Sequence, residues 1–408
     1  MGRSDVARAV GRYLARLRRE AGLSLARVVD LLRDDGVELD PSTLSRAERG
    51  DTMLRLDVAE LVTERLGGTL EELGEVIREA RAGLVPITAT SARDVETIRG
   101  EVRSLLEDGA VHDGLRLARS LVEALAGKDP PPVSPEVVAS IRIDLADAYR
   151  RCGMPRLSAR LLEDVLNTAQ VSGEDRIRAL LLYVAAAEMI GDHLRADLYA
   201  NHVASLLDES EGPRLLAWAC FVIGTTCASS GDHERAAAWY VESLRHYERL
   251  GRGRQAAHVR VVLAETFLAL GDERRARELL RDAIGAASRE GWHAIELQAR
   301  KLMADLLLAS GNHRAARAAY HRVAAVARRL DMVNELFLAR HGLWRIAELS
   351  GDQEARRREA VSLRRLLPRV DPRLAEAREF RARRNATRRE RARKKHAART
   401  GARVPHPS

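Results

Sequence analysis

Hydroxyl and guanidinium side chains gather in one short segment near the amino end, "DPSTLSRAERG" at residues 40–50. Asp40 followed by Pro41 signals the start of a helix, because aspartate caps free backbone N–H groups and proline fits the first helical position. Leu44 and Ala47 would anchor this helix inside, so that its polar residues project outward. Side chains of this kind donate hydrogen bonds, and the chemistry they offer is recognition of an acceptor-rich partner. The donors of the segment are Ser42, Thr43, Ser45, Arg46 and Arg49.

Residues that make or break bonds are not grouped in a catalytic motif. The sequence has no Walker loop, no GxSxG, no HExxH and no paired carboxylates that stand apart from ordinary charged helix faces. Its cysteines, Cys152, Cys220 and Cys227, have neither CxxC spacing nor the spacing to histidine of a zinc site, which favours buried reduced thiols. We therefore expect no enzyme activity, no catalytic residues, no bound metal and no cofactor.

Composition indicates an all-α protein of two or three domains. The 408 residues are 46% hydrophobic but only 4% aromatic, and runs of alternating β-branched residues are almost absent. There is no signal peptide and no run of 18 apolar residues, so we expect a soluble, cytoplasmic protein with no membrane partner. The net charge of +9 belongs to the carboxyl-terminal tail, since residues 371–408 hold 13 basic and 4 acidic residues, whereas residues 1–83 hold 14 and 16.

A turn with Gly followed by Asp or Asn recurs every 40 residues. Apolar residues at helical spacing lie between successive turns and are interrupted by a weaker break, so each unit is predicted to be two antiparallel helices. Glycine supplies a turn conformation that is closed to bulkier residues, and the side chain after it caps the next helix. The turn glycines are Gly191, Gly231, Gly271, Gly311 and Gly351.

Small residues follow these turns at a fixed distance. A small side chain five positions beyond the glycine lets the two helices of a unit approach closely. The residues at this position are Ala196, Ala236, Ala276 and Ala316. The pattern resembles the tetratricopeptide repeat and predicts a TPR-like α-solenoid of about seven helical hairpins over residues 93–367. The alternative is a non-repeating helical bundle in which the glycines are spaced by chance.

Residues 8–73 resemble the phage-repressor type of helix-turn-helix, the XRE family, through "LRREAGLSLARVVDLL" and especially "STLSRAERG". The resemblance implies a five-helix domain over residues 1–83 that binds double-stranded DNA, with the helix after Asp40 in the major groove. Arg46 would present a bidentate fork to a guanine, and Ser24 at the start of the preceding helix would donate to a phosphate. The DNA-binding residues implied in this way are Ser24, Ser42, Thr43, Ser45, Arg46 and Arg49.

Three features of this domain bear on how it would bind. Arg18 and Glu48 occupy the places of the family's internal ion pair, so the resemblance gives them a structural role. The turn "RDDGVELD" is about five residues longer than the family's usual one, which leaves the angle between the two helices open. A domain of nearly balanced charge also exerts little long-range attraction on DNA. The alternative is therefore a helical module that binds protein.

Segments of different composition flank the predicted solenoid. Residues 84–92 contain Pro86 and several small polar residues, and we expect a linker that acts as a flexible joint. A homodimer is expected by analogy, since this type of motif usually reads two half-sites. Residues 368–408 form a basic tail that is predicted to be partly disordered. The tail would be a solvated segment, a non-specific contact to phosphates, or a segment docked on acidic solenoid residues.

The concave face of the solenoid is the candidate ligand site. In the repeat register one inward row is rich in acidic side chains, which suits a peptide with a free amine or basic groups; an ordinary solvated helix face is the alternative. The candidate ligand-binding residues are Asp147, Glu188, Thr225, Glu265, Asp305 and Arg345. A helix-turn-helix followed by such repeats resembles the RRNPP class of bacterial regulators, in which a signalling peptide changes the fit of a dimer to DNA. The sequence thus predicts a DNA-binding transcriptional regulator that senses a peptide or partner protein, or alternatively an interaction scaffold whose first domain binds protein.

Overall fold

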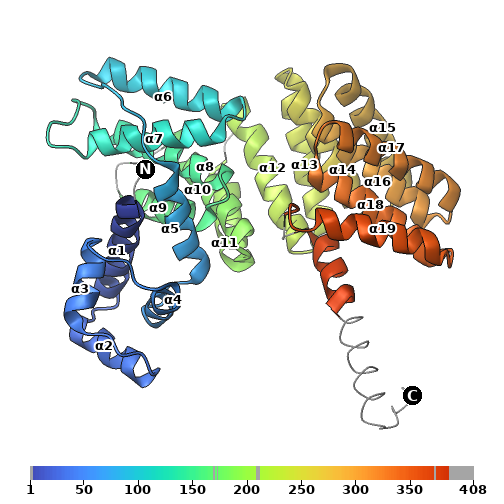
Figure 1. The fold of residues 1–408 in the computed structure, drawn as a ribbon. Coiled ribbons are helices and arrows are strands. Elements are labelled where there is room, and N and C mark those ends of the chain that lie inside the picture. Colours follow the sequence, from blue (N-terminus) through green and yellow to red (C-terminus); the bar gives the residue numbers. More distant parts are fainter. Residues whose placement is uncertain (1–2, 169–170, 172, 208–211, 372–373, 386–408) are drawn as a thin grey trace, which may run out of the picture. The chain divides into compact units, whose positions relative to one another are not determined.

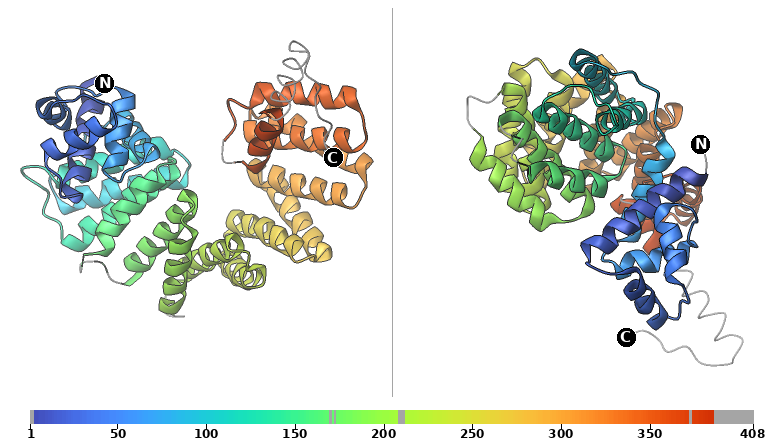
Figure 2. Two further views of the ribbon diagram at one scale, coloured as in Figure 1. Left: turned by 90° about the horizontal axis from the view of Figure 1, so that it is seen from below. Right: turned by 90° about the vertical axis from the view of Figure 1, so that its left-hand side faces the viewer.

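The computed structural model describes residues 3–168, 171, 173–207, 212–371 and 374–385 (Figure 1, Figure 2). Every regular element in these ranges is a helix, as the composition predicts. None of these helices is both long enough and apolar enough to span a bilayer. The chain divides into two compact units, residues 1–232 and 233–408. The predicted domain boundary at residue 83 therefore falls inside the first unit.

Five helices make up the amino-terminal part of the first unit (Figure 1). They are α1 (Arg3–Glu20), α2 (Leu25–Asp34), α3 (Pro41–Arg49), α4 (Leu56–Arg65) and α5 (Leu70–Ala82). The ends of α3 follow the sequence signals, because Asp40 caps it by accepting from the N–H of Ser42 and Gly50 ends it at a φ of 79°. Leu14, Leu32 and Leu44 are almost completely buried and form the centre of this group of helices.

Antiparallel helices fill the rest of both units. The first unit continues with α6 (Ala92–Glu107), α7 (Val111–Leu125), α8 (Pro135–Arg151), α9 (Pro155–Leu166), α10 (Gly173–Ile190), α11 (His193–Leu206) and α12 (Pro213–Ser229). The second unit contains α13 (His233–Arg249), α14 (Gly253–Ala269), α15 (Glu273–Glu290), α16 (His293–Ala309), α17 (His313–Arg329), α18 (Val333–Leu349) and α19 (Gln353–Leu366). Each helix packs on the next within its unit, and the first helices of successive pairs, such as α6, α8 and α10, are also neighbours.

The repeated turns explain why the helices pair so closely. Gly271 has a φ of 81°, which only glycine adopts without strain, and the side chain of Asp272 accepts from the N–H of Arg275 at 3.0 Å. Ala276 is then completely buried against the preceding helix. The same cap recurs at Asp192, Asn312 and Asp352, and the same buried alanine at Ala196, Ala236 and Ala316.

The segment between α5 and α6 differs from the expected flexible joint. The N–H of Val85 donates to Ser120 Oγ of α7 at 2.9 Å, and Val85 and Ile87 pack against buried residues. One hydrophobic core includes residues of α1 to α9, among them Leu73 of α5 and Leu157 of α9. The first five helices and the first repeats are therefore joined by a common core, which a free hinge would not allow.

Over its described part, the predicted tail matches one of its three alternatives, a segment docked on acidic residues of the solenoid, since Arg383 donates to Glu348 of α18 at 2.6 Å. After α19, residues 375–385 are helical, and Phe380 packs edge-on against Phe337 and Trp344 of α18. Phe380 is only 4% exposed. This segment is therefore packed on the last repeat instead of solvated. Residues 386–408, the remainder of the predicted basic tail, lie outside the described residues.

Candidate functional site

The buried side of helix α3 packs against α1. Leu44 and Ala47 are 1% and 3% exposed, and Gly11 of α1 approaches the α3 backbone so closely that an added Cβ would lie 2.6 Å from the Glu48 carbonyl oxygen. Arg18 Nε and Nη2 donate to the two carboxylate oxygens of Glu48 at 2.6 and 2.8 Å, as the resemblance implied. The position of α3 is therefore fixed by backbone contact and by a bidentate ion pair.

The other face of α3 carries the predicted contact residues. Ser42, Arg46 and Arg49 are exposed, and Thr43 and Ser45 are half-buried. The hydroxyls of Ser42 and Thr43 donate to Asp40 at 2.6 and 3.1 Å, and these bonds lower the pKa of Asp40. Arg46 Nη2 donates to Thr43 at 3.2 Å and Arg49 Nη1 to Ser45 at 2.7 Å. Within the described residues the side chain of Arg46 makes no other hydrogen bond or ion pair, so most of its donors face solvent.

The long turn between α2 and α3 is braced against α4. Arg65 Nε donates to Asp35 at 2.6 Å, and the half-buried Val37 and Leu39 pack on the core. Ser24 caps α2 by accepting from the N–H of Arg27 at 3.2 Å, which leaves its exposed hydroxyl proton free to donate. The structure therefore gives the extra turn residues fixed partners, and it places Ser24 at a helix amino end where a phosphate oxygen is favoured.

Three carboxylates of α5 connect the first five helices to the repeats. Glu75 is 1% exposed and accepts from the backbone N–H of Leu157 in α9 at 2.9 Å. Glu79 accepts from the hydroxyl of Tyr149 in α8 at 2.5 Å and lies 3.3 Å from Arg119 Nε in α7. Each bond joins α5 to a different helix of the first two repeats.

Glu72 is the third of these carboxylates. It is 7% exposed, accepts from the Tyr13 hydroxyl of α1 at 3.1 Å and pairs with Arg160 of α9. Loss of water on burial raises the pKa of Glu72 and of Glu75, and the nearby arginines oppose this rise. Buried charges of this kind tolerate little change in geometry, so α5 is tied to α1 on one side and to the repeats on the other.

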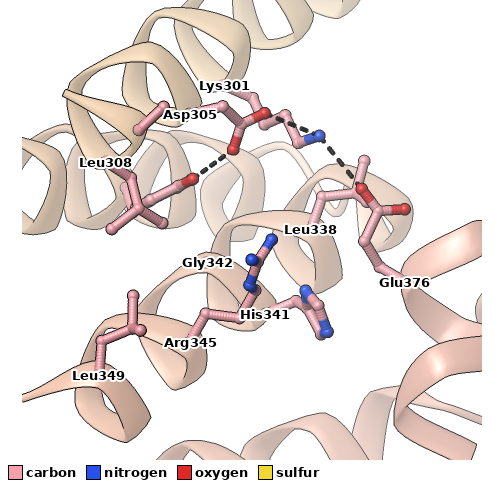
Figure 3. A pocket seen from close by; sticks show the side chains of 11 residues that line it. Lys301, Asp305, Leu308, Leu338, His341, Gly342, Arg345, Leu349 and Glu376 are labelled. Carbon is pink, nitrogen blue, oxygen red and sulfur yellow. Dashed lines mark hydrogen bonds and ion pairs between the residues drawn. The ribbon is translucent and has the colours of Figure 1, made fainter. Parts of the chain in front are cut away.

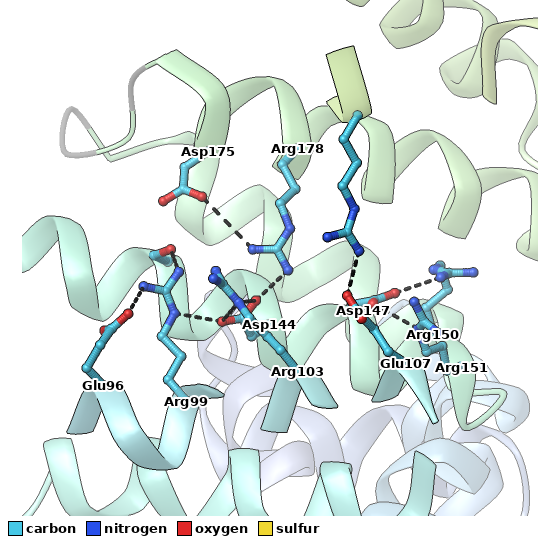
Figure 4. A network of polar contacts seen from close by, with 12 residues as sticks. Glu96, Arg99, Arg103, Glu107, Asp144, Asp147, Arg150, Arg151, Asp175 and Arg178 are labelled. Atoms are coloured by element: carbon cyan, nitrogen blue, oxygen red, sulfur yellow. Dashed lines mark hydrogen bonds and ion pairs between the residues drawn. The ribbon is translucent and has the colours of Figure 1, made fainter. Parts of the chain in front are cut away.

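In the first unit, a buried ion-pair network joins the first helices of successive repeats (Figure 4). Asp144 of α8 has a side chain only 2% exposed and accepts from Arg99 Nε at 2.9 Å and Arg103 Nε at 3.2 Å, both in α6. Arg178 of α10 pairs with the same carboxylate. Three helices are thus held by one aspartate, and the guanidinium groups around it outnumber the carboxylate.

The predicted ligand residues of the first unit are engaged within the protein. Asp147 pairs with Arg150 at 2.6 Å and Arg151 at 2.9 Å; burial alone would raise its pKa, but the two arginines lower it. Glu188 lies 3.2 Å from His193 Nδ1, and the hydroxyl of Thr225 donates to a carbonyl of its own helix. A cationic ligand would therefore have to displace existing partners of Asp147 and Glu188.

Two of the three predicted residues of the second unit line one cavity (Figure 3). Asp305 of α16 and Arg345 of α18 line this cavity of about 430 Å³. Glu265 of α14 is not among the lining residues. Loss of water around its carboxyl group, and then the nearby charges of Asp305 and Glu376, raise the pKa of Glu265. The six predicted ligand residues thus fall into two groups of three, and each group lies in its own unit.

Lys301, His341 and Glu376 also line the cavity, and sequence reasoning missed them. Lys301 lies 3.0 Å from Asp305 and 3.1 Å from Glu376, and burial lowers the pKa of His341. A signal existed for Lys301, which precedes Asp305 by four residues and so shares its helix face. Glu376 lies in a basic stretch of the sequence that gave no reason to place it in a site.

Comparisons with known proteins bear on the repeats. The model of the tetratricopeptide repeat matches residues 214–289. These residues contain tetratricopeptide repeats. The apo form of the quorum sensor NprR from B. thuringiensis has a similar structure, with a TM-score of 0.55 and 13% identity over 88% of this chain and 97% of that chain. The apo form of RapI has the same TM-score at 9% identity, covering 68% of this chain and 77% of that chain.

A signal-transduction ATPase from Pyrococcus horikoshii with a tetratricopeptide repeat sensor is also similar, with a TM-score of 0.51 and 14% identity over 84% of this chain and 52% of that chain. No curated protein matches the sequence. Identities this low establish a shared helical-repeat fold, and the role of the chain has to be argued from its own residues.

Proposed function

We propose that the protein is a sequence-specific DNA-binding transcriptional regulator. The observation that supports this most directly is the exposed face of α3, where Arg46 and Arg49 stand beside three hydroxyl groups on a helix anchored by Leu44 and Ala47. On DNA, Arg46 would exchange its single bond to Thr43 for a bidentate pair with a guanine edge. Ser24 would hold a phosphate at the amino end of α2.

The repeats are proposed to sense a short peptide or a partner protein and to hold two copies together as a cytoplasmic homodimer without enzyme activity. Support comes from the tetratricopeptide repeats at residues 214–289 and from the fold shared with the quorum sensor NprR. The buried contacts of α5 with the first repeats add a physical reason, because repacking of these repeats would move the first five helices with them.

A second candidate is an interaction scaffold whose first five helices bind protein. Residues 1–83 hold 14 basic and 16 acidic residues, so their attraction to a polyanion is small. Asp40 also places a carboxylate at the amino end of α3, where it already engages Ser42 and Thr43. Both features suit a protein partner better than a duplex.

The deciding experiment uses the full chain, since the first five helices share their core with the repeats. Genomic fragments retained by the purified protein would define a site, and fluorescence anisotropy would measure binding to that site and to its single-base variants. Arg46→Ala should cost about 1–3 kcal/mol and remove discrimination at one base pair. Arg274→Ala, an exposed arginine of the second unit, should change nothing. Failure to bind any duplex, or equal binding to all sequences, contradicts the proposal and favours the scaffold.

A further inference from the structure

The cavity of the second unit is lined by segments that are far apart in the sequence. Residues of α16 and α18 supply most of its wall, and Glu376 from the helical residues 375–385 supplies another side (Figure 3). Its volume of about 430 Å³ lies within the range of pockets that hold small ligands. There is room for a small organic molecule or for the end of a peptide.

Most charges in the lining are already paired. Lys301 lies between Asp305 and Glu376, and the hydroxyl of Tyr320 donates to the second oxygen of Asp305. Arg345 is different, because it is exposed and makes no ion pair or hydrogen bond within the described part of the chain. Figure 3 shows its guanidinium projecting across the cavity from α18. Among the charged residues that line the cavity, the unpaired charge is therefore positive.

Apolar side chains stand beside this guanidinium. Leu308, Leu338 and Leu349 line the cavity, and Leu349 is 61% exposed. An exposed leucine next to an unpaired arginine suits a ligand with an anionic group at one end and a branched hydrocarbon at the other.

We propose that this cavity binds a carboxylate that bears a branched apolar group, with Arg345 as its partner, and that the helical residues 375–385 contribute to the wall of the site through Glu376. The inference rests on the proposed sensor role of the repeats and names the chemistry of the ligand. It departs from the cationic ligand that the acidic row predicted, because both carboxylate oxygens of Asp305 are already engaged, one by Lys301 and one by the Tyr320 hydroxyl. Such a carboxylate belongs either to a small free acid or to the carboxyl end of a peptide.

The test titrates the full-length protein with probes of one carbon skeleton and different charge, followed by ligand-observed NMR. Isovalerate should bind, whereas isopentylamine and isopentanol should bind at least about ten-fold more weakly, since a charged hydrogen-bonded pair is lost. N-acetyl-leucine and its amide distinguish the source of the carboxylate. Tighter binding of N-acetyl-leucine than of isovalerate identifies a peptide end, and the reverse order identifies a free acid.

Two substitutions should act in opposite directions. Arg345→Gln should weaken isovalerate about ten-fold or more. Glu376→Gln should strengthen it about two- to five-fold, because it removes a carboxylate and leaves Lys301 with one partner fewer. Arg358→Gln, an exposed arginine of α19 paired with Glu354, is the matched control and should leave binding unchanged.

Either of two results overturns the inference. One is isopentylamine or N-acetyl-leucinamide binding as tightly as its carboxylate counterpart, or no probe binding at all. The other is Arg345→Gln or Glu376→Gln behaving like Arg358→Gln in folded protein. The readout on Glu376→Gln remains decisive if Arg345→Gln fails to fold. No DNA is present, so this test fails or succeeds independently of the duplex-binding experiment.

Discussion

A methyl group added at Gly11 should destabilise the protein, although alanine is the better helix former. Gly11 lies inside α1, where exchange for alanine ordinarily gains about 1 kcal/mol of helix propensity. Its added Cβ would lie 2.6 Å from the Glu48 carbonyl oxygen and still closer to that of Ala47. Both oxygens belong to the α3 backbone, so no side-chain rotation relieves the clash.

The magnitude follows from these distances. Restoring an ordinary carbon–oxygen contact requires α3 to move by roughly 1 Å from α1, which loosens the packing of Leu44 and Ala47. Overpacking of this kind costs about 1–3 kcal/mol beyond the propensity gain. Gly74 and Gly100 supply matched controls in helix interiors, because an added Cβ meets nothing nearer than 3.6 Å at Gly74 and nothing within 4 Å at Gly100. Alanine at either position should be neutral or stabilise by about 0.5–1 kcal/mol.

Urea denaturation of the three full-length variants, followed by circular dichroism, measures these differences. Amide hydrogen exchange adds the local test, since Gly11→Ala should lower protection in α1 and α3 first. A Gly11→Ala variant as stable as Gly74→Ala, with unchanged exchange in α3, would refute the close approach of the two helices and the fixed position of α3 derived from it.

Three further predictions test other parts of the fold. Tyr149→Phe should reduce the unfolding free energy of the first unit by about 1.5 kcal/mol, because Glu79 loses a charged hydrogen bond. Chemical denaturation would measure this loss, and an unaltered midpoint would contradict the role of this bond. Ala276→Leu should lower the unfolding free energy by about 1–3 kcal/mol in the same assay, since the alanine is completely buried. Arg356→Ala, at the corresponding position of the last repeat, should lower it by less than about 0.5 kcal/mol. Equal losses in the two variants would count against close packing at the turns. Burial lowers the pKa of His341, so the unfolded chain takes up a proton there at higher pH than the folded chain does, and the second unit should lose stability as pH falls below about 6.5. His341→Gln should flatten this slope in thermal melts, and a slope unchanged by the substitution would exclude the histidine as its source.

Local signals in the sequence were sufficient to predict the helices and their turns. Asp40 and Pro41 start α3, and Gly50 ends it, because capping and backbone preference act between neighbouring residues. The 40-residue spacing of glycine, followed by a buried alanine such as Ala276, likewise placed the turns between helices. These interactions are short in range, so a single sequence contains them.

Contacts between distant segments have weaker signals in the amino-acid sequence. Glu72, Glu75 and Glu79 share one face of α5 and meet the first repeats, but carboxylates at helical spacing are also common on solvated helices. Phe380 is buried in a stretch whose charge suggested a solvated tail. The division between residues 232 and 233 has no distinct signal, because the turn at Gly231 resembles the others. Which side chains find partners across the fold depends on tertiary packing, which periodicity alone does not encode.

The contacts inside the first unit decide how a change in the repeats would reach α3. A flexible joint after α5 would let the first five helices move independently, and repacking of α6 to α10 would then have no effect on the exposed arginines. The structure instead links them in series, since Asp144 holds α6, α8 and α10 together, Glu75 and Glu79 hold α5 to α8 and α9, and Glu72 holds α5 to α1. α1 in turn touches the α3 backbone at Gly11. Buried ion pairs and close-packed backbone tolerate little displacement. A shift of one helix in the first repeats therefore either changes the orientation of Arg46 or disrupts one of these contacts.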